Sequence, residues 1–272
     1  MEYKTYIPDQ KLAKQVKLYW SIENLENDAP HERERIFPDG CIELIFNYSD
    51  RWKKYDTDTD FHIQEPCFIH GQLKTYFELE ATGNIGVFSA RMHPAGLQPF
   101  IDFDVDTFTG NTLAMTQLWG KDGETLEKDM LGCKSNEERV DVLEAFLLSK
   151  RQQLKIDNAP VEYCVDAMIQ SVGNISIDEL AESLDIGKRQ LERRFTAAVG
   201  ISPKLFARIT RFQNILQLIE NQEFKSFTTV AYEGGFYDQA HFIKDFRDFT
   251  GLNPKQYFSE NLEMVKHFTF DD

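Results

Sequence analysis

The pattern of apolar and polar positions changes character near residue 120. Before that point, short apolar runs alternate with turn signals, as where Pro38-Asp39-Gly40 separates Ile36-Phe37 from the run at residues 41–46. Proline fixes φ and glycine accepts a positive φ, so this tripeptide predicts a turn between two strands. Further strands are predicted at Cys67–Ile69, Tyr76–Leu79 and Ile85–Met92. We therefore expect a mainly β N-terminal domain, either a barrel or a sandwich.

From Gly123 the apolar positions recur at helical spacing, at Leu126, Met130, Leu131, Val140, Leu143, Phe146 and Leu147. The segment from Lys150 to Ala159 is rich in Gln, Lys, Asp and Asn and is expected to be a linker, after which Pro160 opens a helix reaching Met168. The predicted organisation is an N-terminal domain over residues 1–150, a linker over 151–160, an all-α domain over 161–260 and an acidic tail over 261–272. The fold class expected for the whole chain is α+β multidomain.

One pattern occurs twice near the C-terminus, 51 residues apart. The matching pairs are Leu191 and Phe242, Phe195 and Phe246, Gly200 and Gly251, Pro203 and Pro254, and Phe206 and Tyr257. Ahead of the turns at 185–187 and 234–236 the offset is 50, as for Leu180-Ala181 and Val230-Ala231, so the second copy carries one extra residue within 237–241. Each copy predicts a helix-turn-helix unit of the kind that enters the DNA major groove.

A single long helix is expected between the two copies, over residues 203–221. Ser202 is placed to cap it, and Pro203 suits its first turn. Its apolar residues form a broad stripe made of Leu205, Phe206, Ile209, Phe212, Ile215, Leu216 and Ile219. The stripe predicts packing against both units, which fixes their separation near the roughly 34 Å that two successive major grooves require.

The helix that would read DNA in the first unit is predicted over residues 188–199, with Leu191, Phe195 and Val199 facing inward. In the second unit Phe242, Phe246 and Phe249 face inward. The opposite faces are the candidate DNA contacts, namely Arg189, Glu192, Arg193 and Thr196 in the first unit and Gln239, Ala240, His241 and Lys244 in the second. Arginine pairs with guanine, glutamine with adenine, glutamate with the cytosine amino group, and alanine meets a thymine methyl.

These faces have a plainer interpretation as the solvated sides of amphipathic helices. Core packing explains apolar repeats, but it does not explain two complete helix-turn-helix layouts in matching register, which favours DNA binding. Residues 173–258 hold 11 Lys+Arg and 11 Asp+Glu, whereas residues 1–172 hold 18 and 30. The net charge of -15 therefore lies mainly outside the paired units, and a neutral reading module favours base contacts over indiscriminate phosphate binding.

Residues 173–258 resemble the DNA-binding domain of the AraC/XylS family of transcriptional regulators, and the second unit, AYEGGFYDQAHFIKDFRDFTGLNPKQYF, is similar to the family signature nearly end to end. The resemblance implies two subdomains reading adjacent major-groove segments through positions matching Arg189, Glu192 and Arg193, and through Gln239, Ala240, His241 and Lys244. Gly187 departs from the pattern, since serine is common there.

The N-terminal domain resembles a domain of unknown role that is fused to some of these regulators. The matching pieces are Phe37-Pro38-Asp39-Gly40, Glu43-Leu44-Ile45-Phe46, Gly71, VFSARMHPAGLQPF and Leu118-Trp119-Gly120. The expected partners are promoter DNA, with a small-molecule effector, a second copy of the chain and RNA polymerase as open possibilities. No membrane partner is expected, and the cytoplasm is the expected location, since the chain has no long apolar run or secretion signal.

The sequence offers no candidate catalytic centre, cofactor or metal site. His62, His70 and His93 lack the spacing of a metal site, and the four cysteines are expected to be free thiols. Glu43 and Arg91 either pair inside a ligand pocket or point to solvent. An enzyme or repair protein that uses the paired units for delivery remains the alternative to a regulator.

Overall fold

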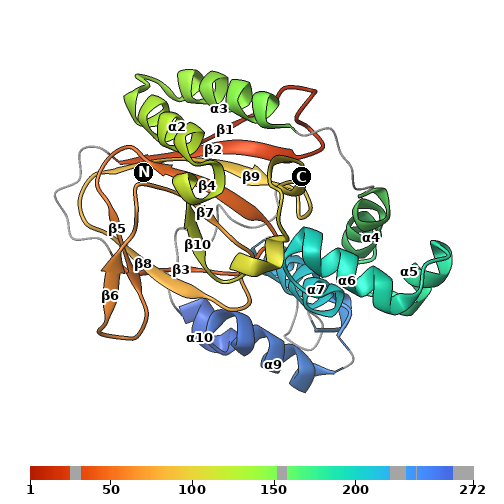
Figure 1. Ribbon diagram of the computed structural model, residues 1–272. Helices are drawn as coiled ribbons and strands as arrows, with labels where there is room; N and C mark the ends of the chain where they lie inside the picture. Colours follow the sequence, from red (N-terminus) through yellow and green to blue (C-terminus); the bar gives the residue numbers. More distant parts are fainter. Residues whose placement is uncertain (25–31, 152–157, 221–230, 237, 260–272) are drawn as a thin grey trace. The chain divides into compact units, whose positions relative to one another are not determined.

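The computed structural model describes residues 1–24, 32–151, 158–220, 231–236 and 238–259, shown in Figure 1. The chain divides into two compact units. Unit 1 comprises residues 1–33, 41–72 and 78–157, and unit 2 comprises residues 34–40, 73–77 and 158–272. The α+β class is confirmed, because unit 1 is built on β-sheet with helices and unit 2 is predominantly helical.

Two antiparallel sheets form the β part of the chain. The larger sheet has the strand order β1-β2-β9-β4-β7-β10, and β8, β5 and β6 lie in that order in the second sheet. The strands are β1 (Glu2–Tyr6), β2 (Val16–Asn24), β3 (Glu34–Ile36), β4 (Ile42–Asn47), β5 (Trp52–Tyr55), β6 (Phe61–Ile63), β7 (Cys67–His70), β8 (Phe77–Ala81), β9 (Ile85–Met92) and β10 (Thr112–Ala114). The predicted strands are confirmed, with β9 at its predicted bounds and β4, β7 and β8 within two residues of theirs.

One face of the larger sheet carries the hydrophobic core of unit 1. Alternate residues of β4 and β9, such as Leu44, Phe46 and Phe88, are fully buried there. The helices that cover this face contribute Leu126 and Leu143 to the same core. The helical elements of unit 1 are η1 (Gln98–Phe100), η2 (Val105–Phe108), α1 (Met115–Trp119), α2 (Lys121–Gly132) and α3 (Asn136–Lys150). The helical pattern predicted after Gly123 is confirmed.

The other face of the larger sheet holds a buried polar cluster. Glu43 and Arg91 lie opposite each other on β4 and β9, and Arg91 Nε donates to Glu43 Oε1 at 2.7 Å. Trp20 Nε1 and Ser89 Oγ donate to the other carboxylate oxygen, at 3.1 and 2.5 Å. Of the two alternatives for Glu43 and Arg91, the pairing is confirmed and the exposure of both side chains to solvent is wrong, since the Arg91 side chain is 5% exposed. A ligand pocket around this pair stays a prediction.

Unit 2 contains the helices of the C-terminal part of the chain. They are α4 (Ala159–Gln170), α5 (Ile177–Ser183), α6 (Lys188–Val199), α7 (Pro203–Glu220), α9 (Gln239–Thr250) and α10 (Pro254–Ser259). Residues 231–233 are also helical. The expected helix over 203–221 is confirmed as α7 up to Glu220, whereas Val230, Tyr237 and the tail over 261–272 lie outside the described residues. Among the described residues, every helix is too short or too polar to cross a bilayer.

The twofold sequence pattern is repeated in the backbone. Asp185 and Gly235 both have positive φ at the turns, and Gly200 and Gly251, which end α6 and α9, both lie in the left-handed region. The ring pairs that close the two units also match, since Phe195 lies against Phe206 at 5.6 Å, and Phe246 lies against Tyr257 at 5.4 Å. The two copies therefore fold in the same way from α6 and α9 onward.

Candidate nucleic-acid interface

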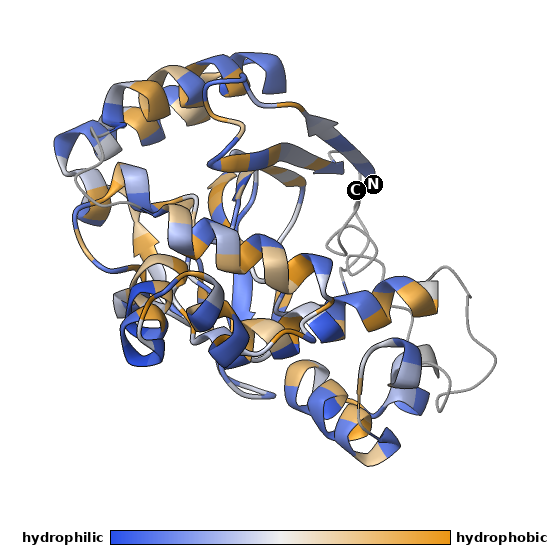
Figure 2. Cartoon of the chain, turned by 90° about the vertical axis from the view of Figure 1, so that its right-hand side faces the viewer, coloured by the Kyte–Doolittle hydropathy of each residue, from blue (hydrophilic) through white to orange (hydrophobic). Residues whose placement is uncertain are grey.

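Helix α6 presents a polar face that is separate from its packing face. Its inward residues Leu191, Phe195 and Val199 are buried as predicted. Figure 2 shows hydrophobic and hydrophilic residues alternating along the helices. Of the outward residues, Arg189 and Arg193 are exposed, and the other two predicted contacts, Glu192 and Thr196, are partly buried.

Two of the charged side chains on α6, both arginines, are available to bind a ligand. Lys188 Nζ lies 2.8 Å from Asp178 Oδ2, and this hydrogen bond raises the pKa of the lysine. Within the described part of the chain, Arg189 and Arg193 have no such ion pair. The Thr196 hydroxyl donates to the Glu192 carbonyl at 2.8 Å, so it is already engaged with its own helix. The geometry therefore favours the two arginines over Thr196 as groups that can donate to a ligand.

Helix α9 begins with a side-chain cap and exposes all four of its predicted contacts. The carboxylate of Asp238 accepts from the His241 amide at 2.7 Å, which satisfies one of the free N–H groups of the first turn. Gln239, Ala240, His241 and Lys244 are exposed. Behind them Phe242, Phe246 and Phe249 are buried as predicted.

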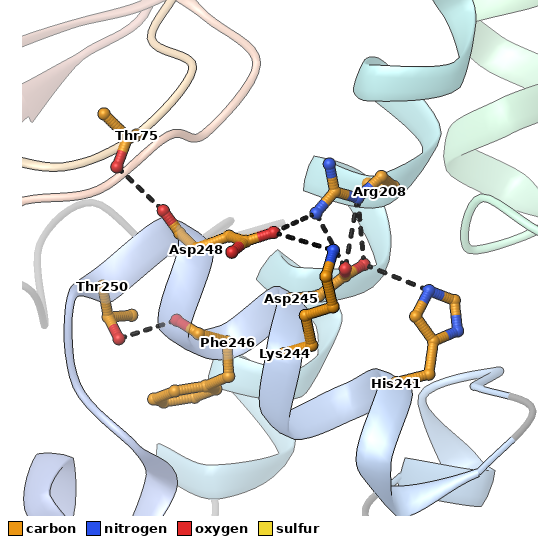
Figure 3. A network of polar contacts seen from close by, with 8 residues as sticks. All are labelled: Thr75, Arg208, His241, Lys244, Asp245, Phe246, Asp248 and Thr250. Carbon is orange, nitrogen blue, oxygen red and sulfur yellow. Dashed lines mark hydrogen bonds and ion pairs between the residues drawn. The ribbon is translucent and has the colours of Figure 1, made fainter.

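A network of charges lies directly behind the exposed face of α9, as Figure 3 shows. Arg208, on α7, binds Asp245 through Nε and Nη2, and its Nη2 also lies 2.8 Å from Asp248 Oδ2. The carboxylates reach two of the candidate contacts, because Lys244 Nζ lies 3.5 Å from Asp248 and His241 Nε2 lies 3.7 Å from Asp245. The Asp245 side chain is 1% exposed, so its ion pair with Arg208 links the buried side of α9 to α7 and helps to fix the orientation of α9.

The outer side of α9 is hollowed into an open groove, which is lined by Ala240, Ile243, Lys244, Arg247, Asp248 and Gly251. These residues follow one stripe along the helix, at spacings of three and four. Ala240 and Lys244, two of the predicted contacts, belong to this stripe. It combines apolar atoms with two cations, Lys244 and Arg247, which suit base edges and phosphates, and with one carboxylate, Asp248, which repels phosphates.

Helix α7 packs against both reading helices. Near its start, Phe206 contacts Phe195 of α6 at 5.6 Å between ring centroids. Further along, Phe212 contacts Phe246 and Phe249 of α9 at 5.7 and 5.1 Å. The expectation that the joining helix packs on both units is confirmed. Each reading helix is thus fixed on the same rigid element.

Sequence reasoning missed Arg208 and Asp245, the buried charge pair of this site. Asp245 lies between Phe242 and Phe246 on α9, and its partner lies 37 positions earlier on another helix. A carboxylate beside two inward phenylalanines was the available signal, because a buried charge requires a partner. Nothing in the sequence identified which of several basic residues that partner is.

The remaining chemical candidates do not gather at one site within the part of the chain that the structure describes. His62 pairs with Asp56 at the surface, and burial lowers the pKa of His70 to about 4. Burial also raises the pKa of the Cys67 thiol to about 12 and that of the Cys164 thiol to about 11. No group of three or more potential metal ligands occurs among the residues described by the structure.

Two family matches divide the chain. Residues 180–260 match a family described as a helix-turn-helix domain, and residues 4–114 match a domain of unknown function, DUF6597. The first match covers α6, α7 and α9. The second covers β1 to β10.

The relatives with curated names match about a third of this chain. An uncharacterized HTH-type transcriptional regulator of Staphylococcus aureus (strain MSSA476) is 30% identical over 101 residues, which is 35% of this chain and 13% of that protein. The HTH-type transcriptional regulator MtrA of Neisseria gonorrhoeae is 33% identical over 85 residues, 31% of this chain and 28% of MtrA. The chain thus spans only a small part of these relatives.

Solved structures with a similar course include ToxT from Vibrio cholerae, with 14% identity and a TM-score of 0.48 over 84% of this chain and 97% of ToxT. Another is the AraC-like transcriptional activator CuxR, with 12% identity and a TM-score of 0.29 over 79% of this chain and 86% of CuxR.

Proposed function

We propose that the chain is a sequence-specific DNA-binding transcription regulator of the AraC type, because residues 180–260 match a helix-turn-helix domain family and the relatives with curated names are HTH-type transcriptional regulators. In this proposal α6 and α9 enter successive segments of the major groove. Arg189, Glu192 and Arg193 of α6 and Gln239, Ala240, His241 and Lys244 of α9 face the bases and phosphates, and Thr196 lies at the edge of the α6 contact. The protein acts where promoter DNA is, in the cytoplasm.

One observation carries the proposal. Two helices that end in the same left-handed glycine geometry, both packed on α7, each turn a polar face outward. A solvated amphipathic helix needs no second copy in register and no common support. Two rigidly supported copies suit a ligand that presents the same kind of surface twice, as duplex DNA does.

The decisive experiment is selection of bound sites from random duplexes by the full chain. We expect a site with two conserved segments about one helical turn apart. Arg193→Ala should weaken binding and relax base preference in one segment, and Lys244→Ala should do so in the other, each by roughly 1 to 3 kcal/mol where a base contact is lost.

Lys128→Ala, which removes an exposed cation from α2 of unit 1, is the matched control and should leave binding unchanged. The proposed contacts would be contradicted if the selection enriched no motif, or if the double variant Arg193→Ala/Lys244→Ala bound the selected duplex as tightly as the wild type.

Unit 1 takes the control function in this proposal, through uptake of a small molecule or through dimerisation. Sedimentation of the full chain with and without its selected duplex distinguishes the two, because dimerisation doubles the mass of the protein bound. RNA polymerase is the expected further partner of an activator, whereas a repressor would compete with it. Run-off transcription on the selected promoter separates these outcomes.

An enzyme that uses the helix-turn-helix domain for delivery is the weaker candidate. Alkyl transfer requires a thiolate, which a lowered pKa supplies. The Cys67 and Cys164 thiols have raised pKa values because they are buried. An alkylation assay on the full chain tests this candidate directly.

A further inference from the structure

Two short segments from the N-terminal half of the chain are built into the helical unit. Residues 34–40 precede β4, residues 73–77 follow β7, and both belong to unit 2. The first segment contains the Phe37-Pro38-Asp39-Gly40 motif. The sequence predicts a turn there but no function for it. The contacts that both segments make within unit 2 indicate what that function is.

The first segment places an aromatic ring in the core beneath α9. Phe37 is 5% exposed, and its ring lies 6.1 Å from that of Phe212 and 6.0 Å from that of Tyr257. Phe212 is the residue of α7 that contacts Phe246 and Phe249. Phe37 therefore extends the aromatic cluster that supports the second reading helix.

The backbone of the same segment is tied to α7. Gln213 is 1% exposed, and its Nε2 donates to the Pro38 carbonyl at 2.6 Å. At Gly40, φ is +78°, and a Cβ would lie 3.0 Å from the Phe206 ring. The turn thus combines a required glycine with a buried hydrogen bond, which fixes where Phe37 enters the core.

The second segment completes the C-terminal end of α9. Carbonyls in the last turn of a helix have no partner within it. The Thr75 hydroxyl donates to the Asp248 carbonyl at 2.8 Å, as Figure 3 shows. Next to it, the ring of Tyr76 lies so close to Gly251 that a Cβ there would be 2.5 Å from it. Asp248 also binds Arg208 and lies beside Lys244.

We propose that Phe37 and Thr75 are positioning residues for the second reading helix, so that DNA recognition by α9 depends on loops from the N-terminal half of the chain. The proposal rests on the proposed function of α9. Residues 34–40 and 73–77 contact α7, α9 and α10, and Thr75 and Tyr76 lie at the end of the stripe that includes Ala240 and Lys244. A change in either loop therefore alters the orientation of α9 and leaves the exposed arginines of α6 in place.

The test uses the full chain and the duplex selected from the random pool, in three versions: intact, with the α6 segment scrambled, and with the α9 segment scrambled. Thr75→Val removes the hydroxyl donor and keeps the side-chain shape. We expect it to weaken binding to the intact duplex roughly fivefold, the effect of about 1 kcal/mol for one hydrogen bond. The loss should disappear on the duplex with the α9 segment scrambled, because the affected contacts are already absent there.

Three further variants complete the design. Thr75→Ser keeps the donor and should bind as the wild type does. Thr82→Val removes an equivalent hydroxyl-to-carbonyl bond in unit 1, where Thr82 donates to the Arg51 carbonyl at 2.6 Å, and should also leave binding unchanged. Phe37→Ala should weaken binding to the intact duplex more than Thr75→Val does, and Phe37→Leu should restore most of it.

The outcomes separate this proposal from the one it rests on. An equal loss for Thr75→Val on the intact and the α9-scrambled duplex, or no loss on either, would overturn the positioning role. Wild-type protein that binds all three duplexes equally would overturn the reading function of the helices, and the positioning role with it. Thermal unfolding shows whether Thr75→Val is folded, and its midpoint is expected to be close to that of the wild type.

Discussion

At the scale of single residues, the charges behind α9 bear on the DNA binding that we propose for its exposed face. Arg208 is held by Asp245 and Asp248, and the hydrogen bond that it donates to the Asp245 carboxylate is the main reason that the arginine pKa is raised. Lys244 shares Asp248 with that arginine. If Lys244 faces DNA as proposed, the carboxylate beside it opposes non-specific attraction to phosphate and so sharpens the preference for the right sequence.

Asp248→Asn should therefore tighten DNA binding. The change removes one negative charge beside Lys244 and keeps the side-chain shape, so we expect affinity at low salt to rise a few-fold, with a smaller gain at high salt because exposed charges are screened. Fluorescence anisotropy over a salt series measures both effects. Asp129→Asn on α2 is the control of equal charge, and an equal gain for both variants would contradict a local role for Asp248.

His70 provides a pH dependence of stability in unit 1. Burial is the main cause of its lowered pKa, and the hydrogen bond between Nδ1 and the Gly71 carbonyl opposes that shift. The unfolded chain, with a histidine pKa of about 6.5, binds more protons than the folded chain between about pH 6.5 and 4. Stability from the neutral histidine is therefore present above this window and is lost as the pH falls through it.

The expected loss is about 3 kcal/mol for a shift from 6.5 to about 4. Denaturant unfolding at pH 7 and pH 4.5 measures it. His70→Gln cannot gain the proton, so its stability should fall less over this range than that of the wild type. Identical pH profiles for the two proteins would show that His70 is not responsible.

At the scale of elements, the repeated pattern predicted the reading helices because it is local. Spacings of three and four among Leu191, Phe195 and Val199 determine which side of α6 is buried, and the same holds for α9. Helix α6 has its predicted bounds, and α7 agrees with its prediction over the described residues. The role of the Phe37-Pro38 turn was not predictable, because its partners Phe212 and Gln213 are about 175 residues away.

Helix α6 lacks the side-chain N-cap that α9 has. Asp238 caps α9 with its carboxylate, whereas Gly187 precedes α6 and has no side chain to offer. Gly187 has φ -58° and ψ 130°, which any residue adopts, and a Cβ there would meet nothing within 4 Å.

Gly187→Ser should therefore stabilise unit 2 by about 0.5 to 1 kcal/mol, through a cap and a less flexible unfolded chain. A higher denaturant midpoint with an unchanged slope would support this. Gly200→Ser is the opposite control, since φ is +94° there, and it should destabilise. A lower midpoint for Gly187→Ser would contradict the capping argument.

At the scale of the whole molecule, charge is divided unevenly along the chain. The paired units are neutral, and most of the net charge of -15 lies in the residues before them. Neutral units gain little from non-specific phosphate contacts, so the DNA binding that we propose would depend on base contacts made by both units together. Composition could predict this division of charge, but it could not predict that residues 34–40 and 73–77 belong with the helices.

The central claim is that α7 holds two reading helices at a fixed separation, so the spacing of the two segments of the DNA site tests it most directly. We would measure affinity for the selected duplex and for one with five base pairs, about half a helical turn, inserted between its segments. The account predicts that the insertion lowers affinity to that of a duplex with one segment scrambled. Unchanged affinity after the insertion would contradict it.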